Sequence, residues 1–209
     1  MPAHPDPLPP KEREYARLLA AWPGMVSGPP APLVEDCLVL LDHLGDARSV
    51  VDVGSGGGMP GIPLKIARPD LRVVLVEADR RKAAFLLHAA ARLELDVEVV
   101  AERAETAARG SLREAFDVAV CRALAPMPAL AELCLPFVRV GGRLLAMKAH
   151  VEDAAQAIEA LGGGPARVAP APSAARERGL VVVVPKVAPT PGAYPRRPGL
   201  PARRPLAGA

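Results

Sequence analysis

Long apolar runs are missing from this 209-residue sequence: none approaches the roughly 18 residues that a membrane-spanning helix needs. The first residues, MPAHPDPLPPKERE, also lack the basic start and apolar segment of a secretory signal. Only three cysteines occur, Cys37, Cys121 and Cys134, and no two are spaced as CxxC, so neither a disulfide framework nor a zinc site is expected. These absences predict a cytoplasmic protein without a membrane partner or a bound metal.

Lysine is scarce as well, providing five of the 26 cationic side chains, and the net charge is only +3. The charge is unevenly placed, because residues 186–209 hold five cations and no acid, whereas residues 1–185 hold 21 basic and 23 acidic groups. Basic residues separated by prolines suit a phosphate backbone. The candidate RNA contacts are Lys148, Arg196, Arg197, Arg203 and Arg204. The alternative for the tail is a solvated extension that contacts no RNA. The alternative for Lys148 is a lysine at the edge of the sheet whose charged end reaches solvent.

What the sequence does contain is alternating strand and helix patterns. Strands are expected at 49–53, 72–78, 97–102, 116–123, 141–149 and 179–187. Helices are expected at 11–22, 33–44, 60–67, 79–93, 126–138 and 151–164. This order predicts an α/β fold with a doubly wound, mostly parallel sheet and helices on both faces. The predicted organisation is a Pro-rich N-terminus with a small helical cap (1–48), the α/β domain (49–188) and a Pro/Arg-rich basic tail (189–209).

Five glycines fall between residues 54 and 61, in the segment VVDVGSGGGMPG that follows the first expected strand. Such a loop lets the backbone approach a ligand closely. Gly56, Gly58 and Gly61 satisfy GxGxxG, and Glu77 lies 21 residues after Gly56, which together fit a dinucleotide site.

The same loop fits a second cofactor, S-adenosylmethionine, through Asp52-x-Gly54-x-Gly56-x-Gly58. In this interpretation Asp52 faces the methionine end of the cofactor, and Glu77 accepts hydrogen bonds from both ribose hydroxyls. A carboxylate directly before the loop would repel a pyrophosphate at the helix N-terminus. Asp52 therefore favours S-adenosylmethionine over a nicotinamide dinucleotide, and a class I, Rossmann-like methyltransferase over an oxidoreductase.

The segment DVGSGGGMPGIPLKIARPDLRVVLVEADRRKAAFL closely resembles the GidB family, bacterial enzymes that methylate N7 of a guanine in 16S ribosomal RNA. Further similar segments follow in order, ERAE, CRAL, ELCLPFV, MKA and YPRRPGLPARRPL, so the resemblance covers about residues 49–205. It implies a ribosomal RNA or small-subunit precursor as substrate. The N-terminal part departs from the family pattern: Pro23 follows Trp22, and LVEDCLVLL lacks the family's His and Asp-Ser.

Carried over to this sequence, the resemblance implies that Gly54 and Met59 line the cofactor site, that Ala104 and Glu105 flank the adenine, and that Arg122 reaches the cofactor or the target. Guanine N7 has a free lone pair, so attack on a methyl group needs no general base. No catalytic base is therefore predicted, and Arg122 is the candidate catalytic residue. Its alternative role is a salt bridge across the loop.

Cys121 stands where a nucleophile of C5-pyrimidine methylation would lie, but its apolar neighbours favour a buried core residue. The leading hypothesis is a 16S ribosomal RNA guanine-N7 methyltransferase. The alternatives are a class I methyltransferase for another RNA or a small molecule, and a non-catalytic nucleic-acid-binding protein that retains the fold. The basic tail is expected to lie apart from the glycine loop, so that its removal leaves cofactor affinity unchanged.

Overall fold

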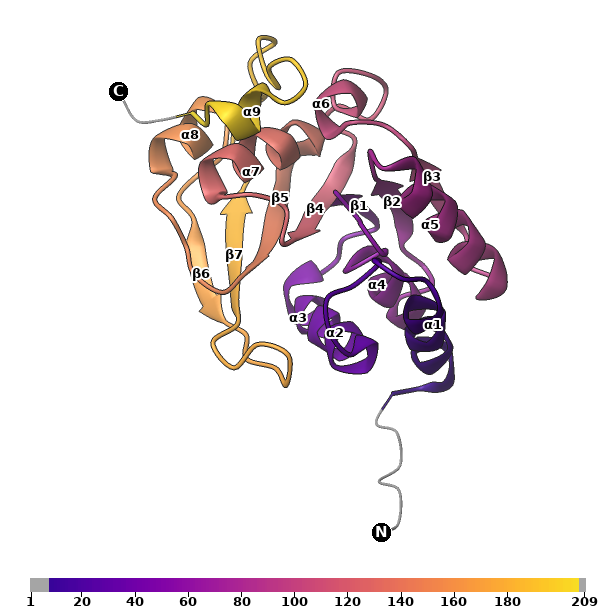
Figure 1. Ribbon diagram of the computed structural model, residues 1–209. Coiled ribbons are helices and arrows are strands. Elements are labelled where there is room, and N and C mark those ends of the chain that lie inside the picture. Colours follow the sequence, from indigo (N-terminus) through magenta and orange to yellow (C-terminus); the bar gives the residue numbers. More distant parts are fainter. Residues whose placement is uncertain (1–7, 207–209) are drawn as a thin grey trace.

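The computed structural model describes residues 8–206 and shows a seven-stranded sheet in the order β3-β2-β1-β4-β5-β7-β6 (Figure 1). The strands are β1 (Ser49–Val53), β2 (Arg72–Val76), β3 (Val97–Val100), β4 (Phe116–Arg122), β5 (Val138–Lys148), β6 (Arg167–Pro170) and β7 (Leu180–Pro185). The first five are parallel, whereas β7 runs antiparallel to β5 and β6 antiparallel to β7. The prediction of a doubly wound, mostly parallel sheet is confirmed.

The helices cover both faces of this sheet. One face is covered by α1 (Pro10–Ala21), α2 (Pro30–Cys37), η1 (Leu38–Leu40), α3 (Leu41–Leu44), α4 (Gly61–Ala67) and α5 (Arg80–Arg92). The other carries α6 (Ala104–Ala107), α7 (Met127–Cys134), η2 (Leu135–Phe137), α8 (Ala155–Ala160) and α9 (Leu200–Arg203). None of the helices within residues 8–206 is both long and apolar enough to cross a bilayer.

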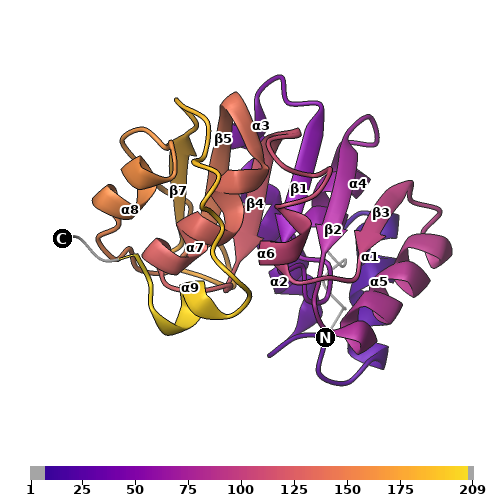
Figure 2. The same ribbon diagram turned by 90° about the horizontal axis from the view of Figure 1, so that it is seen from above.

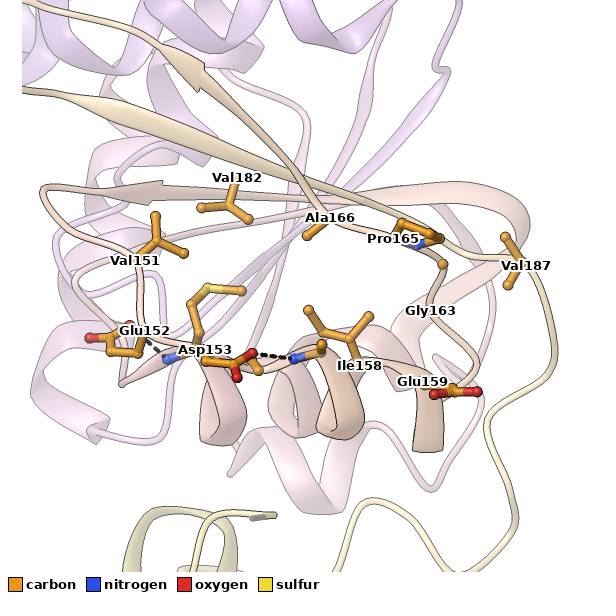
Figure 3. A pocket seen from close by; sticks show the side chains of 14 residues that line it. Val151, Glu152, Asp153, Ile158, Glu159, Gly163, Pro165, Ala166, Val182 and Val187 are labelled. Atoms are coloured by element: carbon orange, nitrogen blue, oxygen red, sulfur yellow. Dashed lines mark hydrogen bonds between the residues drawn. The ribbon is translucent and has the colours of Figure 1, made fainter. Parts of the chain in front are cut away.

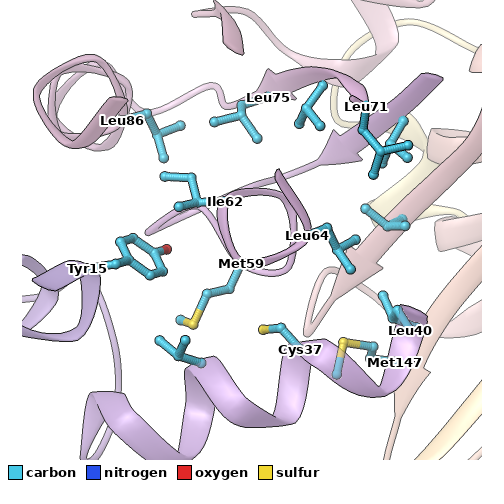
Figure 4. Packing of buried hydrophobic residues seen from close by; sticks show 14 of the residues in the cluster. Tyr15, Cys37, Leu40, Met59, Ile62, Leu64, Leu71, Leu75, Leu86 and Met147 are labelled. Atoms are coloured by element: carbon cyan, nitrogen blue, oxygen red, sulfur yellow. The ribbon is translucent and has the colours of Figure 1, made fainter. Parts of the chain in front are cut away.

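Alternate residues of each central strand enter two separate cores. Val50 of β1 packs with α4 and α5, whereas its neighbour Val51 packs with α7 on the other face. This is the period-two pattern of a strand that is buried on both sides. The N-terminal helices share the first core, in which Tyr15 and Cys37 lie beside Ile62 and Leu64 of α4 (Figure 4).

The chain leaves β1 toward β2 and β3 and then returns to β4 and β5 on the other side of β1. The strand order therefore reverses between β1 and β4. Ligands of open α/β sheets bind outside the carboxyl ends of the strands at such a reversal. The glycine loop follows β1 and residues 123–126 follow β4, so both segments lie at this position.

Besides the short helix α6, two parts of the structure were not anticipated. The first is β6, an edge strand whose residues are mostly exposed and which ends at Pro170; it has no apolar alternation to reveal it. The second is the path of the residues after β7. Residues 189–206, called the strap below, run back along α6 and α7 and include α9 (Figure 2).

Candidate functional site

The glycine loop between β1 and α4 adopts backbone conformations that require glycine at alternate positions. Gly54, Gly56 and Gly58 have φ angles of 70°, 59° and 94°. A Cβ on Gly54 would also lie 2.5 Å from Cδ1 of Leu124. Because L side chains rarely adopt such φ angles, these three positions fix the shape of the loop.

Asp52 lies behind this loop rather than on a pocket wall. Its side chain is fully buried, and Oδ2 accepts a hydrogen bond of 2.9 Å from the Gly61 amide at the start of α4. Oδ1 is buried and has no hydrogen-bond partner among residues 8–206. Burial, together with the nearby Glu77 charge, raises the pKa of Asp52 to about 7, although the Gly61 hydrogen bond opposes the shift.

The amides that a pyrophosphate would need are already used. The Gly61 amide binds Asp52, the Ile62 amide donates to the Gly58 carbonyl, and Pro60 and Pro63 have no N–H. A dinucleotide fingerprint depends on free amides at this helix N-terminus. The structure therefore disfavours a dinucleotide for a reason beyond the charge repulsion expected from Asp52.

Glu77 follows β2 and turns its carboxylate to the loop. Oε2 accepts from the Gly56 amide at 2.8 Å, and Oε1 accepts from the Asp79 amide at 2.8 Å. Each oxygen keeps a second lone pair, because a carboxylate has about four acceptor sites. The side chain is thus held in one orientation while it retains the capacity to bind two hydroxyl groups.

Two adjoining pockets lie over the loop and share Gly54, Gly56, Lys82 and Ala123. The first, of about 330 Å³, is called the methionine-side pocket after the end of S-adenosylmethionine that the sequence analysis expects near Met59; its other lining residues include Met25, Ser27, Leu33, Met59 and Arg122. The second, of about 380 Å³, is called the nucleoside pocket after the ribose and adenine that the sequence analysis expects near Glu77, Ala104 and Glu105; its other lining residues include Glu77, Arg103, Ala104, Glu105, Leu124, Leu133 and Ala202. Of the nine expected cofactor residues, all but Asp52 and Gly58 line one of these pockets. Both volumes suit small-molecule ligands.

The N-terminal cap takes part in this site, which the sequence did not indicate. The Tyr15 hydroxyl of α1 donates a 2.5 Å hydrogen bond to the Gly57 carbonyl, and residues 24–27 line the methionine-side pocket. A Cβ on Gly57 would meet Leu19 Cδ2 at 2.9 Å, so this glycine permits close packing of α1. No local sequence signal links Tyr15 to the loop, since the two are 42 residues apart.

Arg122 at the end of β4 is held between the loop and the cap. Its Nη1 lies 3.6 Å from the Met59 sulfur, and its Nε lies 3.5 Å from Oδ2 of the fully buried Asp36 in α2. Asp36 also binds Arg176 Nε at 2.8 Å and the Ser173 hydroxyl at 2.6 Å, both from the loop between β6 and β7. Arg122 therefore makes the anticipated ion pair and also lines the methionine-side pocket.

The five candidate RNA contacts fall into two groups. Lys148 pairs with Glu152 at 3.1 Å and donates to the Ala125 carbonyl. Arg196 forms a bidentate ion pair with the buried Glu132, with a shortest distance of 2.6 Å. By contrast, the side chains of Arg197, Arg203 and Arg204 are exposed and make no hydrogen bond or ion pair within residues 8–206.

The structure does not support a nucleophilic role for Cys121. Its side chain is fully buried among the core residues of the α7 face, and it lines neither pocket over the glycine loop.

A larger groove of about 910 Å³ lies away from the glycine loop, between α8 and β7 (Figure 3). Apolar side chains dominate its wall, among them Val151, Ile158, Val182 and Val187. None of the expected site residues lines it, so its size does not identify it as the functional site.

Comparison with known proteins gives a consistent result. The family model GidB, described as rRNA small subunit methyltransferase G, matches residues 32–161. A protein named ribosomal RNA small subunit methyltransferase G from a Roseiflexus species is 51% identical over 170 residues, covering 78% of this chain and 73% of that protein. The protein of the same name from Rubrobacter xylanophilus is 43% identical over 215 residues, covering 93% and 82%.

Solved structures of methyltransferases share the fold at low identity. The O-methyltransferase TomG from Streptomyces achromogenes, solved in complex with S-adenosylmethionine, matches with a TM-score of 0.59 at 20% identity, covering 87% of this chain and 91% of TomG. Geranyl diphosphate C-methyltransferase from Streptomyces coelicolor matches with a TM-score of 0.59 at 15% identity, covering 87% and 99%. These similarities show a class I methyltransferase fold.

Proposed function

This chain belongs to the GidB family of ribosomal RNA small-subunit methyltransferases, and on that premise we propose that it methylates N7 of a guanine in 16S ribosomal RNA with S-adenosylmethionine as the methyl donor. The observation that carries the proposal is the pair of adjoining pockets over the glycine loop, with Glu77 in one and Arg122 in the other. Except for residues 24–27 and Ala202, the residues that line the two pockets lie within the family match.

The residues present fit S-adenosylmethionine. Glu77 would accept hydrogen bonds from the ribose hydroxyls, while Ala104, Glu105 and Leu124 would surround the adenine in the nucleoside pocket. Gly54 and Gly56 would let the backbone approach the cofactor, and Met59 would line the methionine end. Asp52 would act from behind, by fixing the Gly61 amide and thereby the end of the loop.

When bound, S-adenosylmethionine supplies a methyl group on a positively charged sulfur. Guanine N7 needs no deprotonation, so the chain has to align the base and exclude water rather than remove a proton. Within the described residues no histidine lines either pocket, in keeping with this chemistry. Residues 24–27 of the N-terminal cap line the methionine-side pocket and would limit the access of water.

We assign Arg122 to the target side of this pocket. The Asp36 carboxylate fixes its guanidinium, and Asp36 is itself fixed by Arg176. A held guanidinium can contact a phosphate or a base edge without losing further side-chain entropy. Arg197, Arg203 and Arg204 would contact the RNA backbone, whereas Lys148 and Arg196 are engaged within the protein. An RNA substrate of this kind, naked or in a small-subunit precursor, implies a cytoplasmic protein.

Methyl transfer to ribosomal RNA tests the proposal. Small ribosomal subunits from a strain without its own enzyme would be incubated with this protein and methyl-labelled S-adenosylmethionine, and the modified base would be mapped by mass spectrometry. A single 7-methylguanine in 16S ribosomal RNA is expected. Label in another RNA, or at another atom of the base, would contradict the assignment.

A further inference from the structure

The strap forms part of the wall of the nucleoside pocket. Ala202 of α9 lines this pocket together with Glu77 and Ala104, although about 125 residues of sequence separate Ala202 from Glu77. The Gly199 amide donates a 2.7 Å hydrogen bond to Oε1 of the buried Glu105, another lining residue. The expectation that the tail lies apart from the cofactor loop is therefore wrong.

The base of the strap is firmly anchored. Arg113 donates to the carbonyls of Thr190 and Tyr194 at 2.7 and 2.8 Å, and Arg196 pairs with the buried Glu132 of α7. Beyond Arg196, within the described residues, the hydrogen bond between Gly199 and Glu105 is the one that ties the strap to the rest of the domain. Within α9, Pro201 is buried, and the Arg204 carbonyl accepts a 2.7 Å hydrogen bond from Nη2 of the anchored Arg196. The part that lines the pocket therefore makes fewer polar contacts with the rest of the domain than the base of the strap does.

The outer side of this wall is basic. Arg203 and Arg204 directly follow Ala202, are exposed, and have no side-chain partner within residues 8–206. Arg197 is similarly exposed before α9. Unpaired arginines are available for bidentate contacts with phosphate. The segment that contains α9 therefore has one residue that lines the nucleoside pocket, Ala202, directly before two exposed arginines that are suited to RNA.

We propose that the strap couples RNA binding to cofactor binding: phosphate contacts at Arg203 and Arg204 hold α9 against the nucleoside pocket, and a bound cofactor in turn holds α9 in position for RNA. The proposal rests on the proposed function for the identity of the RNA. Coupling between two sites is reciprocal, so each ligand should raise the affinity for the other by the same factor.

The test measures equilibrium binding of S-adenosylhomocysteine, which cannot react, with and without small ribosomal subunits that lack the methyl group. For the wild-type protein, saturating subunits should lower the dissociation constant of S-adenosylhomocysteine about tenfold, within the usual range of coupling. In the double variant Arg203→Ala/Arg204→Ala, the dissociation constant without RNA should stay within about twofold of wild type, and the RNA-dependent decrease should fall below about threefold.

The wall itself is tested by Ala202→Phe, with Ala193→Phe as a matched control on an exposed part of the strap that lines neither pocket. Ala202→Phe should raise the dissociation constant of S-adenosylhomocysteine at least about tenfold, because the ring enters the pocket, and Ala193→Phe should leave it unchanged. If Ala202→Phe lowers the Tm more than the control does, Ala202→Val gives the same comparison with a smaller side chain.

Two results would overturn the coupling: a wild-type dissociation constant that subunits do not change, or full enhancement in the double arginine variant. Equal binding by the Ala202 and Ala193 variants would remove α9 from the cofactor site. If one of these three results were found while the protein still methylated 16S ribosomal RNA normally, the coupling or the role of α9 would be wrong but the proposed function would stand. Absent methylation by a wild-type protein that binds S-adenosylhomocysteine would instead count against the proposed function.

Discussion

Glu77 joins three parts of the site, because its carboxylate holds the Gly56 amide, holds the Asp79 amide and lines the nucleoside pocket. In the proposed complex, Glu77→Ala would remove two charge-assisted hydrogen bonds to the ribose, and it would also remove the acceptor of the Gly56 amide in the loop. We expect the affinity for S-adenosylmethionine to fall by at least about 2 kcal/mol, roughly 30-fold, in calorimetry. Glu98→Ala removes an exposed acid of β3 that lines neither pocket over the loop and should bind normally. Normal binding by the Glu77 variant would remove this residue from the site.

Asp52 makes stability depend on pH in an unusual direction. Its pKa is about 7 in the folded chain and near 3.9 when unfolded, so between these values the folded state binds the extra proton. Unfolding free energy therefore falls as pH rises through this interval and levels off above about pH 7. Asparagine does not titrate but can still accept the hydrogen bond from the Gly61 amide.

We accordingly expect Asp52→Asn to gain roughly 2 kcal/mol in unfolding free energy relative to wild type between pH 5 and pH 7. Urea unfolding of both proteins at the two pH values measures this difference. A difference that is constant with pH would show that Asp52 is ionised throughout, with its charge compensated in the folded protein.

The helical cap stabilises the glycine loop through one polar contact. Tyr15 of α1 is fully buried, and among residues 8–206 its hydroxyl is the side-chain group that donates a hydrogen bond to the Gly57 carbonyl. Tyr15→Phe keeps the ring packed but leaves that carbonyl unpaired, which should cost about 1–2 kcal/mol of unfolding free energy. Tyr194→Phe changes the only other tyrosine, whose hydroxyl makes no hydrogen bond within residues 8–206, and should cost less than about 0.5 kcal/mol. Equal effects of the two substitutions in urea unfolding would mean that the cap holds the loop by packing alone.

The strap is anchored to α7 by an ion pair whose acidic partner is buried. Arg196 is partly exposed, but Glu132 of α7 is fully buried and accepts from both the backbone amide and the guanidinium of Arg196. Arg196→Ala leaves a buried carboxylate without its cation and should cost about 3 kcal/mol of unfolding free energy. Arg197→Ala, its exposed neighbour, should change this free energy by less than about 0.5 kcal/mol.

Denaturant unfolding of the two arginine variants separates an anchoring role from a purely RNA-binding one. If Arg196→Ala were as stable as Arg197→Ala, the strap would not depend on Glu132. Removal of residues 189–209 takes away the same ion pair, so the truncated protein should lose stability and, with Ala202 gone, cofactor affinity as well.

The sequence by itself determined six of the seven strands of the described sheet, the glycine loop and the family. Apolar strands that are buried on both faces leave a strong local pattern, and the loop after β1 needs glycine at fixed spacings because of its φ angles. Glu77 could be named as a candidate from the sequence, since it directly follows β2, the first strand after the glycine loop. The exposed edge strand β6 lacks such a pattern and was missed.

Only the tertiary structure decided which distant residues complete the site. Tyr15 reaches the Gly57 carbonyl across 42 residues, Ala202 enters the nucleoside pocket from the end of the chain, and Arg196 is used to neutralise Glu132. The structure also moved Asp52 from the pocket wall to a supporting position behind the loop. A local pattern records which residues are buried or need a particular backbone conformation, but it does not record which residue lies opposite them. A basic tail therefore has the same sequence signature whether its arginines face solvent or a buried carboxylate.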